Sequence, residues 1–124
     1  NAAHLPTAAA RYAASLPAQF DVVHLGLGDD GHTASWPRGD PVVAAPFDVA
    51  ISGEYRGHVR MTLTPRVVNR ARHRLLLVTG SAKADMVQRW VLCDPSLPAD
   101  RVRRSGTVLV ADAAAAAALV ATAR

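Results

Sequence analysis

The chain has 124 residues, of which 50% are hydrophobic and 19% are charged, and its formal net charge is +4 at pH 7. This length fits one domain with a sizeable core, and the hydrophobic content excludes a globally disordered chain. No apolar run reaches the roughly 20 residues of a membrane-spanning helix, and no charged and apolar leader opens the sequence, so we expect a cytoplasmic protein without a secretory signal.

Two features of the composition bear on compartment and partners. Cys93 is the only cysteine, which is typical of a protein from a reducing compartment. Lys83 is the only lysine, so arginine supplies nearly all of the positive charge. Arginine can form bidentate hydrogen bonds to phosphate. A positive net charge is compatible with either a phosphorylated substrate or nucleic acid.

The N-terminal part predicts a helix followed by a buried strand. In residues 4–16, Thr7 has the residue type of an N-cap, and the helical spacing places Tyr12 in the core. Residues 22–26 form a short valine-rich run, which predicts a strand buried on both faces. His24 within this run is expected to be a buried histidine with satisfied hydrogen bonds.

A loop rich in glycine and polar residues follows this strand. It contains Gly26, Gly28, Asp29, Asp30, Gly31, His32, Thr33 and Ser35. Ligands of open α/β sheets lie just beyond the carboxyl ends of strands, and glycine lets a substrate approach the backbone closely. Histidine can accept a proton from water near neutral pH, and a carboxylate two residues away can fix its tautomer. The loop is therefore a candidate active site, with an ordinary solvated turn as the alternative.

The middle of the chain predicts two short extended segments and a helix. Three prolines mark residues 37–46 as a loop, and extended patterns follow at 47–52 and 58–64. Thr64 and Pro65 fit the N-cap and the first position of a helix that reaches about residue 72. In the second extended segment, apolar and polar side chains alternate, with Val59, Met61 and Leu63 on one side and His58, Arg60 and Thr62 on the other.

The C-terminal part repeats the order strand, then helix. Residues 74–80 predict a strand, and Ser81 fits the cap of a helix that runs to residue 92. A loop is expected at 94–104 and a strand at 108–110. Asp112 then fits the cap of a helix over 113–123. Such alternation is typical of an α/β fold with a parallel sheet flanked by helices and right-handed crossovers. We expect residues 1–124 to form a single α/β domain.

The histidines and the cysteine do not have the spacing of a metal site. No two histidines are separated as in H-x-x-x-H, and Cys93 stands alone, so we predict neither a metal nor a cofactor. Residues 56–74 are rich in arginine, but only Phe47 and Tyr55 are aromatic nearby and no nucleic-acid recognition motif fits. We therefore expect no nucleic-acid partner and no membrane.

Residues 26–35 read GLGDDGHTAS, which closely resembles the G-x-G-x-D-G-H-T-A-S signature of 6-phosphogluconolactonases. In that family the motif usually continues as Ser-Leu-Phe-Pro, whereas here Trp36 and Pro37 follow Ser35. The related glucosamine-6-phosphate deaminases share G-x-D-G-H but continue as Ile-Ala-Phe-Asn-Glu-Pro, so Thr33 to Ser35 favour the lactonase. Further similar segments are RMTLT at 60–64, VNRAR at 68–72 and VTGSAKA at 78–84.

The resemblance implies a Rossmann-like sheet that corresponds to the C-terminal half of a larger family fold. The family is about twice this length, and its N-terminal half carries a Ser-Gly-Gly loop and an Asp-Glu-Arg motif that help to hold the sugar phosphate. The chain would then be either a fragment that lacks this half or a protein that covers the exposed surface as a homo-oligomer.

The resemblance also implies an activity and a role for each site residue. The reaction is the hydrolysis of 6-phospho-D-glucono-1,5-lactone in the pentose phosphate pathway, without a cofactor. His32 matches the general base, Asp30 the carboxylate that orients it, and Arg60 the side chain that pairs with the substrate phosphate. Gly28, Gly31 and Thr33 complete the substrate-binding loop, and backbone N–H groups there would support the oxyanion. Lys83 matches a family position with either a structural or a phosphate-binding role.

Two other functions remain open from the sequence. A non-catalytic remnant or sugar-phosphate-binding module is compatible with the missing half and the shortened motif at Trp36. A deaminase-like isomerase is compatible with the shared G-x-D-G-H.

Overall fold

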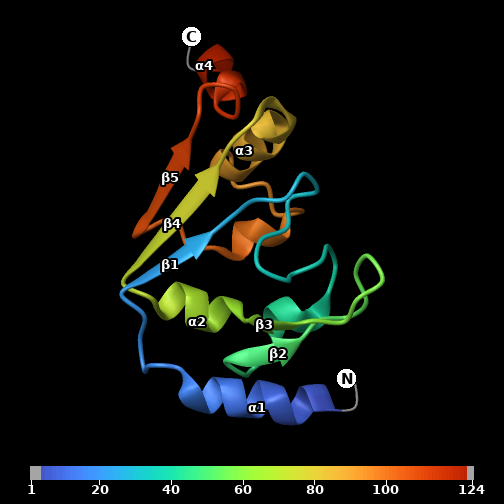
Figure 1. Cartoon of the computed structure of the whole chain (residues 1–124). Helices are drawn as coiled ribbons and strands as arrows, with labels where there is room; N and C mark the ends of the chain where they lie inside the picture. The colour runs from blue at the N-terminus through green and yellow to red at the C-terminus, as the bar shows by residue number, and fades with distance from the viewer. Residues whose placement is uncertain (1–3, 123–124) are drawn as a thin grey trace.

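The computed structural model describes residues 4–122, and its centre is a parallel sheet of three strands, which confirms the predicted α/β fold. The strands β1 (Val22–Leu25), β4 (His73–Val78) and β5 (Thr107–Ala111) lie in the order β1-β4-β5 (Figure 1). Leu25 pairs with Leu76, and Leu76 pairs with Leu109. Because the strands are parallel, the loops that follow them leave at one edge of the sheet.

A small antiparallel sheet is inserted between β1 and β4 along the chain. It consists of β2 (Val49–Ile51) and β3 (Met61–Leu63). Helix α1 (Leu5–Ser15) lies against β2, at the end of the molecule opposite α4 (Ala117–Thr122), as Figure 1 shows. The remaining helices are α2 (Pro65–Arg70) and α3 (Ala84–Val91), with short 3₁₀ turns at η2 (Pro41–Ala44), η3 (Ser81–Lys83) and η4 (Pro98–Arg101).

Capping residues explain where the helices begin and where predicted boundaries were wrong. Ser81 lies in η3 and does not cap α3, which starts at Ala84. Pro6 lies in the first turn of α1 and Pro65 opens α2, where a missing N–H group costs nothing. Helix α1 starts at Leu5, so Thr7 is inside it and is not its cap. The Asp112 carboxylate accepts a hydrogen bond from the Ala115 N–H at 2.8 Å. It therefore caps the turn before α4, which starts at Ala117 instead of 113; the predicted end at residue 123 lies outside the described residues.

One face of the parallel sheet packs into the core. Leu76 and Val78 of β4 point into it and are covered by α3 through Val87 and Trp90. Trp36 is completely buried, and its indole Nε1 donates a hydrogen bond to the Leu63 carbonyl at 2.8 Å. This bond ties the segment after the glycine-rich loop to β3.

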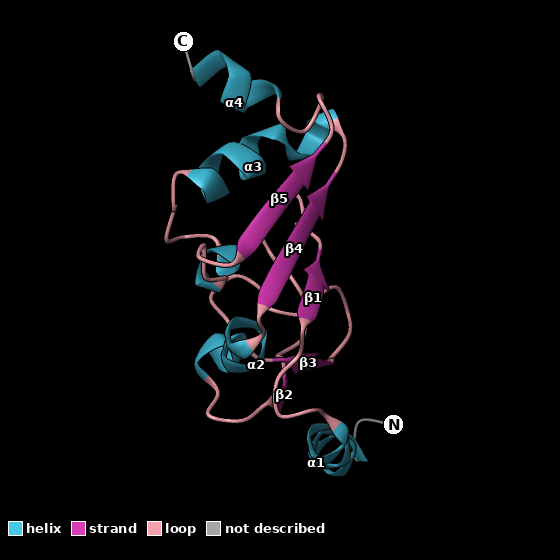
Figure 2. Cartoon of the chain, turned by 90° about the vertical axis from the view of Figure 1, so that its left-hand side faces the viewer, coloured by secondary structure: helices cyan, strands magenta, loops and turns pink. Residues whose placement is uncertain are grey.

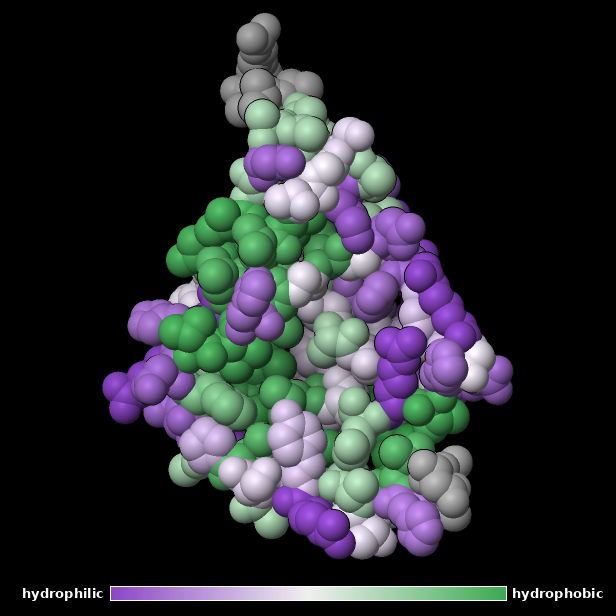
Figure 3. Space-filling view, viewed as in Figure 1, coloured by the Kyte–Doolittle hydropathy of each residue, from purple (hydrophilic) through white to green (hydrophobic). Residues whose placement is uncertain are grey.

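The other face of the parallel sheet is uncovered. Val108 is 60% exposed and Val22 is 56% exposed, and Leu77 and Val110 are also exposed. Figure 3 shows a hydrophobic area over β5, β4 and β1 on the face turned toward the viewer, and Figure 2, turned by 90°, shows α3 on the opposite side of the sheet, to the left of β5. The predicted burial of β1 on both faces was therefore wrong for this chain, and His24 is exposed on the open face. Parallel sheets normally have both faces covered.

A further expectation about the core was wrong. Tyr12 is 42% exposed, because α1 packs through the small residue Ala9 instead. In β3, the polar side chain of Thr62 is buried and the side chain of Met61 is exposed. Thr62 can be buried because its hydroxyl accepts a hydrogen bond from the Ser35 N–H at 3.1 Å and donates to the Leu63 carbonyl.

Arg74 is a buried charge within β4. It is 1% exposed, and its guanidinium donates hydrogen bonds to the carbonyls of Val68, Asn69, Ala71 and Ser105 and to the hydroxyl of Thr107. These bonds join the end of α2 to the start of β5. Separately, none of the helices within residues 4–122 is both long and apolar enough to cross a membrane.

Candidate active site

The glycine-rich loop leaves the carboxyl end of β1 and folds back on itself. The Gly28 N–H donates to the His32 carbonyl at 2.7 Å, and the Gly31 N–H donates to the Gly28 carbonyl at 3.0 Å. Gly31 has a positive φ of 87°, and a Cβ there would lie 2.5 Å from Leu97 Cδ2, so only glycine fits. Both amides are therefore used inside the loop, which differs from the expected role of these N–H groups in holding an oxyanion.

Gly28 has a steric role toward His32. A Cβ on Gly28 would lie closer than 3.0 Å to both Nδ1 and Cε1 of the His32 ring. The imidazole therefore packs directly on the Gly28 Cα, and the glycine makes room for the candidate base.

Asp30 and His32 form a close pair. His32 Nδ1 lies 2.5 Å from Asp30 Oδ1, and the same oxygen accepts a hydrogen bond from the His32 N–H at 3.1 Å. Because a carboxylate can only accept, the Nδ1 atom carries the proton and Nε2 is the nitrogen available as a base. Both side chains are about one-third exposed or less, so the pair is reachable from solvent.

Tyr55 completes the hydrogen bonding of this carboxylate, and the sequence reasoning missed it. Its hydroxyl donates to Asp30 Oδ2 at 2.6 Å, and its ring centroid lies 5.5 Å from that of His32. Burial alone would raise the pKa of Asp30, but the hydrogen bonds from Tyr55 and His32 outweigh it and hold that pKa well below its ordinary value. No spacing in the sequence links residue 55 to residue 30; only its place in the turn after β2 brings it there.

Thr33 and Lys83 both contact the backbone of the loop. The Thr33 hydroxyl donates to the Gly26 carbonyl at 2.7 Å and is 1% exposed, so it holds the loop in shape. Lys83 Nζ donates to the Leu27 carbonyl at 2.7 Å from the turn before α3. A hollow of about 340 Å³, which we name the Lys83 hollow, is lined by Gly26, Leu27, Gly28, His32, Thr33, Ala34 and Lys83.

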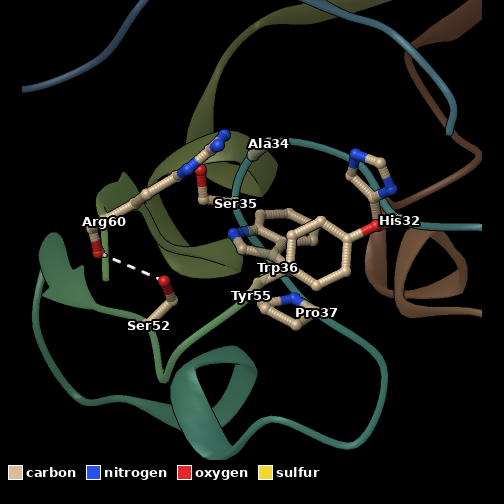
Figure 4. Close-up of a pocket in the computed structure, with 8 residues that line it drawn as sticks. All are labelled: His32, Ala34, Ser35, Trp36, Pro37, Ser52, Tyr55 and Arg60. Atoms are coloured by element: carbon tan, nitrogen blue, oxygen red, sulfur yellow. Dashed lines mark hydrogen bonds between the residues drawn. The ribbon is translucent and has the colours of Figure 1, made fainter. Parts of the chain in front are cut away.

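A second, smaller hollow is also lined by His32. This Arg60 hollow has room for about one water molecule and is lined by His32, Ala34, Ser35, Trp36, Pro37, Ser52, Tyr55 and Arg60. Figure 4 shows His32 at one side of the Trp36 and Tyr55 rings and Arg60 at the other, with the Arg60 guanidinium beside Ser35. Within residues 4–122, no carboxylate pairs with Arg60, which leaves its guanidinium free for an anion.

Asp29 lies on the outer side of the loop. It is exposed and lies 3.6 Å from Arg56, as expected for a solvent-facing residue that the motif does not require. Among the residues that the structure describes, no three histidine, cysteine or acidic side chains are grouped in a way that would hold a metal ion.

Comparison with known proteins identifies one family. A sequence model of the family described as glucosamine-6-phosphate isomerases/6-phosphogluconolactonase matches residues 1–110. A 6-phosphogluconolactonase from Synechocystis is 42% identical over 64 residues, which are 52% of this chain and 27% of that protein. A probable 6-phosphogluconolactonase from Drosophila melanogaster is 33% identical over 121 residues, which are 90% of this chain and 50% of that protein.

Solved structures agree with this relationship. The 6-phosphogluconolactonase from Thermotoga maritima superimposes with a TM-score of 0.75 at 28% identity, over 86% of this chain and 50% of that one. The enzyme of the same name from Trypanosoma brucei superimposes with a TM-score of 0.72 at 26% identity, over 92% of this chain and 52% of that one. This chain thus spans at most about half the length of these relatives, and it belongs to the glucosamine-6-phosphate isomerase/6-phosphogluconolactonase family.

Proposed function

We propose that this chain supplies the catalytic half of a 6-phosphogluconolactonase, which hydrolyses 6-phospho-D-glucono-1,5-lactone to 6-phosphogluconate. The observation that carries the proposal is the 2.5 Å contact between Asp30 and His32 Nδ1, in a loop at the carboxyl end of β1. In a neutral imidazole this contact places the proton on Nδ1 and leaves Nε2 unprotonated, which is the form that general-base catalysis requires.

The reaction needs one proton to move twice. His32 Nε2 takes a proton from water as the water oxygen bonds to the lactone carbonyl carbon. The C–O bond to the ring oxygen then breaks, and His32 returns the proton to that oxygen. Asp30 stabilises the imidazolium between the two steps. General-base catalysis contributes about 10²–10⁴-fold, which suits a lactone because the ester is already reactive.

We propose that Arg60 binds the phosphate of the substrate. Its guanidinium has no carboxylate partner within the described residues and lies at the hollow that His32 also lines. A planar guanidinium matches two phosphate oxygens, so the contact would orient the substrate as well as attract it. Lys83 places a second positive charge near the loop, at the Lys83 hollow.

We further propose that activity requires the uncovered sheet face to be occupied. Apolar surface is exposed on this face by Val22, Leu77, Val108 and Val110. The related proteins are about twice as long as this chain, and their additional length is available to cover such a face. An N-terminal half packed on this face would also supply sugar-phosphate contacts that this chain lacks. A homo-oligomer that covers the same face is the alternative arrangement.

The test compares wild type with His32→Ala, each as the 124-residue chain alone and mixed with the N-terminal half of a full-length relative. The competent form is whichever of these two, the chain alone or the mixture, has its uncovered sheet face occupied. We expect this form of the wild type to accelerate lactone opening above the spontaneous rate. His32→Ala should abolish that acceleration and still bind 6-phosphogluconate. Turnover that survives in His32→Ala would remove this residue from the mechanism. Binding without turnover in wild type would identify a sugar-phosphate-binding module, and ammonia release from glucosamine 6-phosphate would identify a deaminase.

A further inference from the structure

The turn between β2 and β3 holds a tyrosine against the candidate base. Tyr55 and His58 pair across a two-residue turn, with hydrogen bonds of 2.9 Å and 3.1 Å between their backbones. The two central residues, Arg56 and Gly57, have positive φ angles of 50° and 80°, which is the geometry of a tight type I′ hairpin. The hairpin fixes the backbone from which the Tyr55 side chain projects.

Contacts with Arg56 and His32 restrict the Tyr55 side chain further. The Arg56 guanidinium lies over the Tyr55 ring, 5.2 Å from its centroid, and also lies 3.6 Å from the Asp29 carboxylate. The Tyr55 ring is tilted by 55° to the His32 ring. The phenol is therefore placed by neighbours that belong to the hairpin and to the loop together.

The Tyr55 hydroxyl takes the carboxylate oxygen that His32 does not use. Asp30 Oδ1 contacts Nδ1 and the N–H of His32, and Asp30 Oδ2 accepts the hydrogen bond from Tyr55. With a partner on each oxygen, the plane of the carboxylate is fixed. A fixed carboxylate holds the imidazole in one orientation and in one tautomer, as outer partners do for metal-bound histidines.

We propose that Tyr55 is a positioning residue that acts through Asp30: it keeps the His32 imidazole protonated on Nδ1 and its Nε2 free. The inference rests on the proposed function only in giving His32 the role of base. The hairpin also leads directly to Arg60, whose carbonyl accepts a hydrogen bond from the Ser52 N–H at 2.8 Å. One short segment thus carries both the hydroxyl that holds Asp30 and the guanidinium that would hold the phosphate.

The test uses Tyr55→Phe, which removes the hydroxyl and keeps the ring, with Tyr12→Phe as the matched control at an exposed tyrosine. Nitrogen-15 NMR of the His32 ring in the 124-residue chain reports the tautomer without any need for turnover. We expect Nδ1–H to dominate in wild type and in Tyr12→Phe, and the mixture of tautomers found in free imidazole to appear in Tyr55→Phe. In the competent form, kcat should fall about 10-fold or more in Tyr55→Phe while KM changes less than about threefold.

A measurement on the wild type covers the case in which the variant does not fold. The hydrogen bond to Asp30, with burial, raises the pKa of the Tyr55 phenol above its ordinary value. A carbon-13 titration that gives Tyr55 the ordinary value of about 10 would overturn the proposal. So would an unchanged His32 tautomer in a folded Tyr55→Phe chain, and this result would leave the lactonase assignment standing. Absence of lactonase activity in the competent form of the wild type would refute that assignment and would not affect the NMR test, which uses the 124-residue chain alone.

Discussion

Replacing Gly28 with alanine should disable the candidate base without unfolding the chain. The new Cβ would lie closer than 3.0 Å to Nδ1 and Cε1 of His32 and 3.0 Å from Asp30 Oδ1. The φ angle of Gly28 is not positive, so the alanine backbone is tolerated and the strain falls on the imidazole. The ring must move away, because it is the side chain that meets the Cβ.

The size of the effect follows from the distance that the ring must move. To reach an ordinary contact of at least 3.4 Å with the new methyl group, the imidazole must shift by more than about 1 Å. A misplacement of about 1 Å already costs about 10²-fold in rate. A 10²-fold loss in kcat corresponds to about 2.7 kcal/mol of transition-state free energy. Because the 2.5 Å contact to Asp30 Oδ1 would be lost as well, the tautomer of His32 should also change.

Gly26→Ala is the matched control in the same loop. A Cβ on Gly26 meets no atom within 4 Å, and its φ angle is not positive either. Initial rates of lactone hydrolysis in the competent form, together with unfolding by urea, separate the loss of the base from the loss of the fold. We expect Gly26→Ala to keep wild-type activity and both variants to unfold near the wild-type midpoint. A Gly28→Ala variant whose rate lies within threefold of Gly26→Ala would refute the packing argument.

Two further predictions concern stability. Hydrogen bonds from the Ser96 hydroxyl and N–H and from Arg89 lower the pKa of Asp94 from 3.8 to about 2, so folding favours its ionised form. The difference in free energy of unfolding between wild type and Asp94→Asn should be constant above about pH 4 and should shrink as the pH falls from 4 to 2. Urea unfolding at several pH values measures this difference. A difference that does not depend on pH would contradict the prediction. Arg74→Met should destabilise the folded chain by about 3 kcal/mol or more, because it leaves several buried carbonyls unpaired. The exposed control Arg72→Met should change the free energy of unfolding by less than about 0.5 kcal/mol. Equal effects of the two substitutions in thermal unfolding would refute the role of the buried network.

The order of strands and helices was predictable from local pattern. The apolar run before Gly26 and the run around Leu76 were both long enough and bounded clearly enough to predict strands, and both are strands of the parallel sheet. Pro65 gave the start of α2 because its ring fits only the first turn of a helix. Exact boundaries were less predictable, as with α4, because the Asp112 side chain caps a turn that precedes the helix.

Burial was less predictable than secondary structure. His24 and one side of β1 were expected in the core and are exposed, because residues 4–122 cover only one face of the sheet. Tyr12 was also expected in the core and is exposed, because α1 packs through Ala9 instead. Periodicity tells which residues share a face, but it does not tell whether another element covers that face. The same limit explains Thr62, which can be buried because the Ser35 N–H of a distant loop donates to its hydroxyl and the neighbouring Leu63 carbonyl accepts from it.

The sequence by itself determined the α/β alternation, the family resemblance and the candidate pair Asp30 and His32, because these depend on residues close together in the chain. Only the tertiary structure decided that Tyr55 reaches Asp30 and that Arg60 shares a hollow with His32. It also assigned the Gly28 and Gly31 amides to bonds within the loop. These contacts join segments that the pattern of the sequence does not connect, and the packing of the hairpin against the loop is what brings them together.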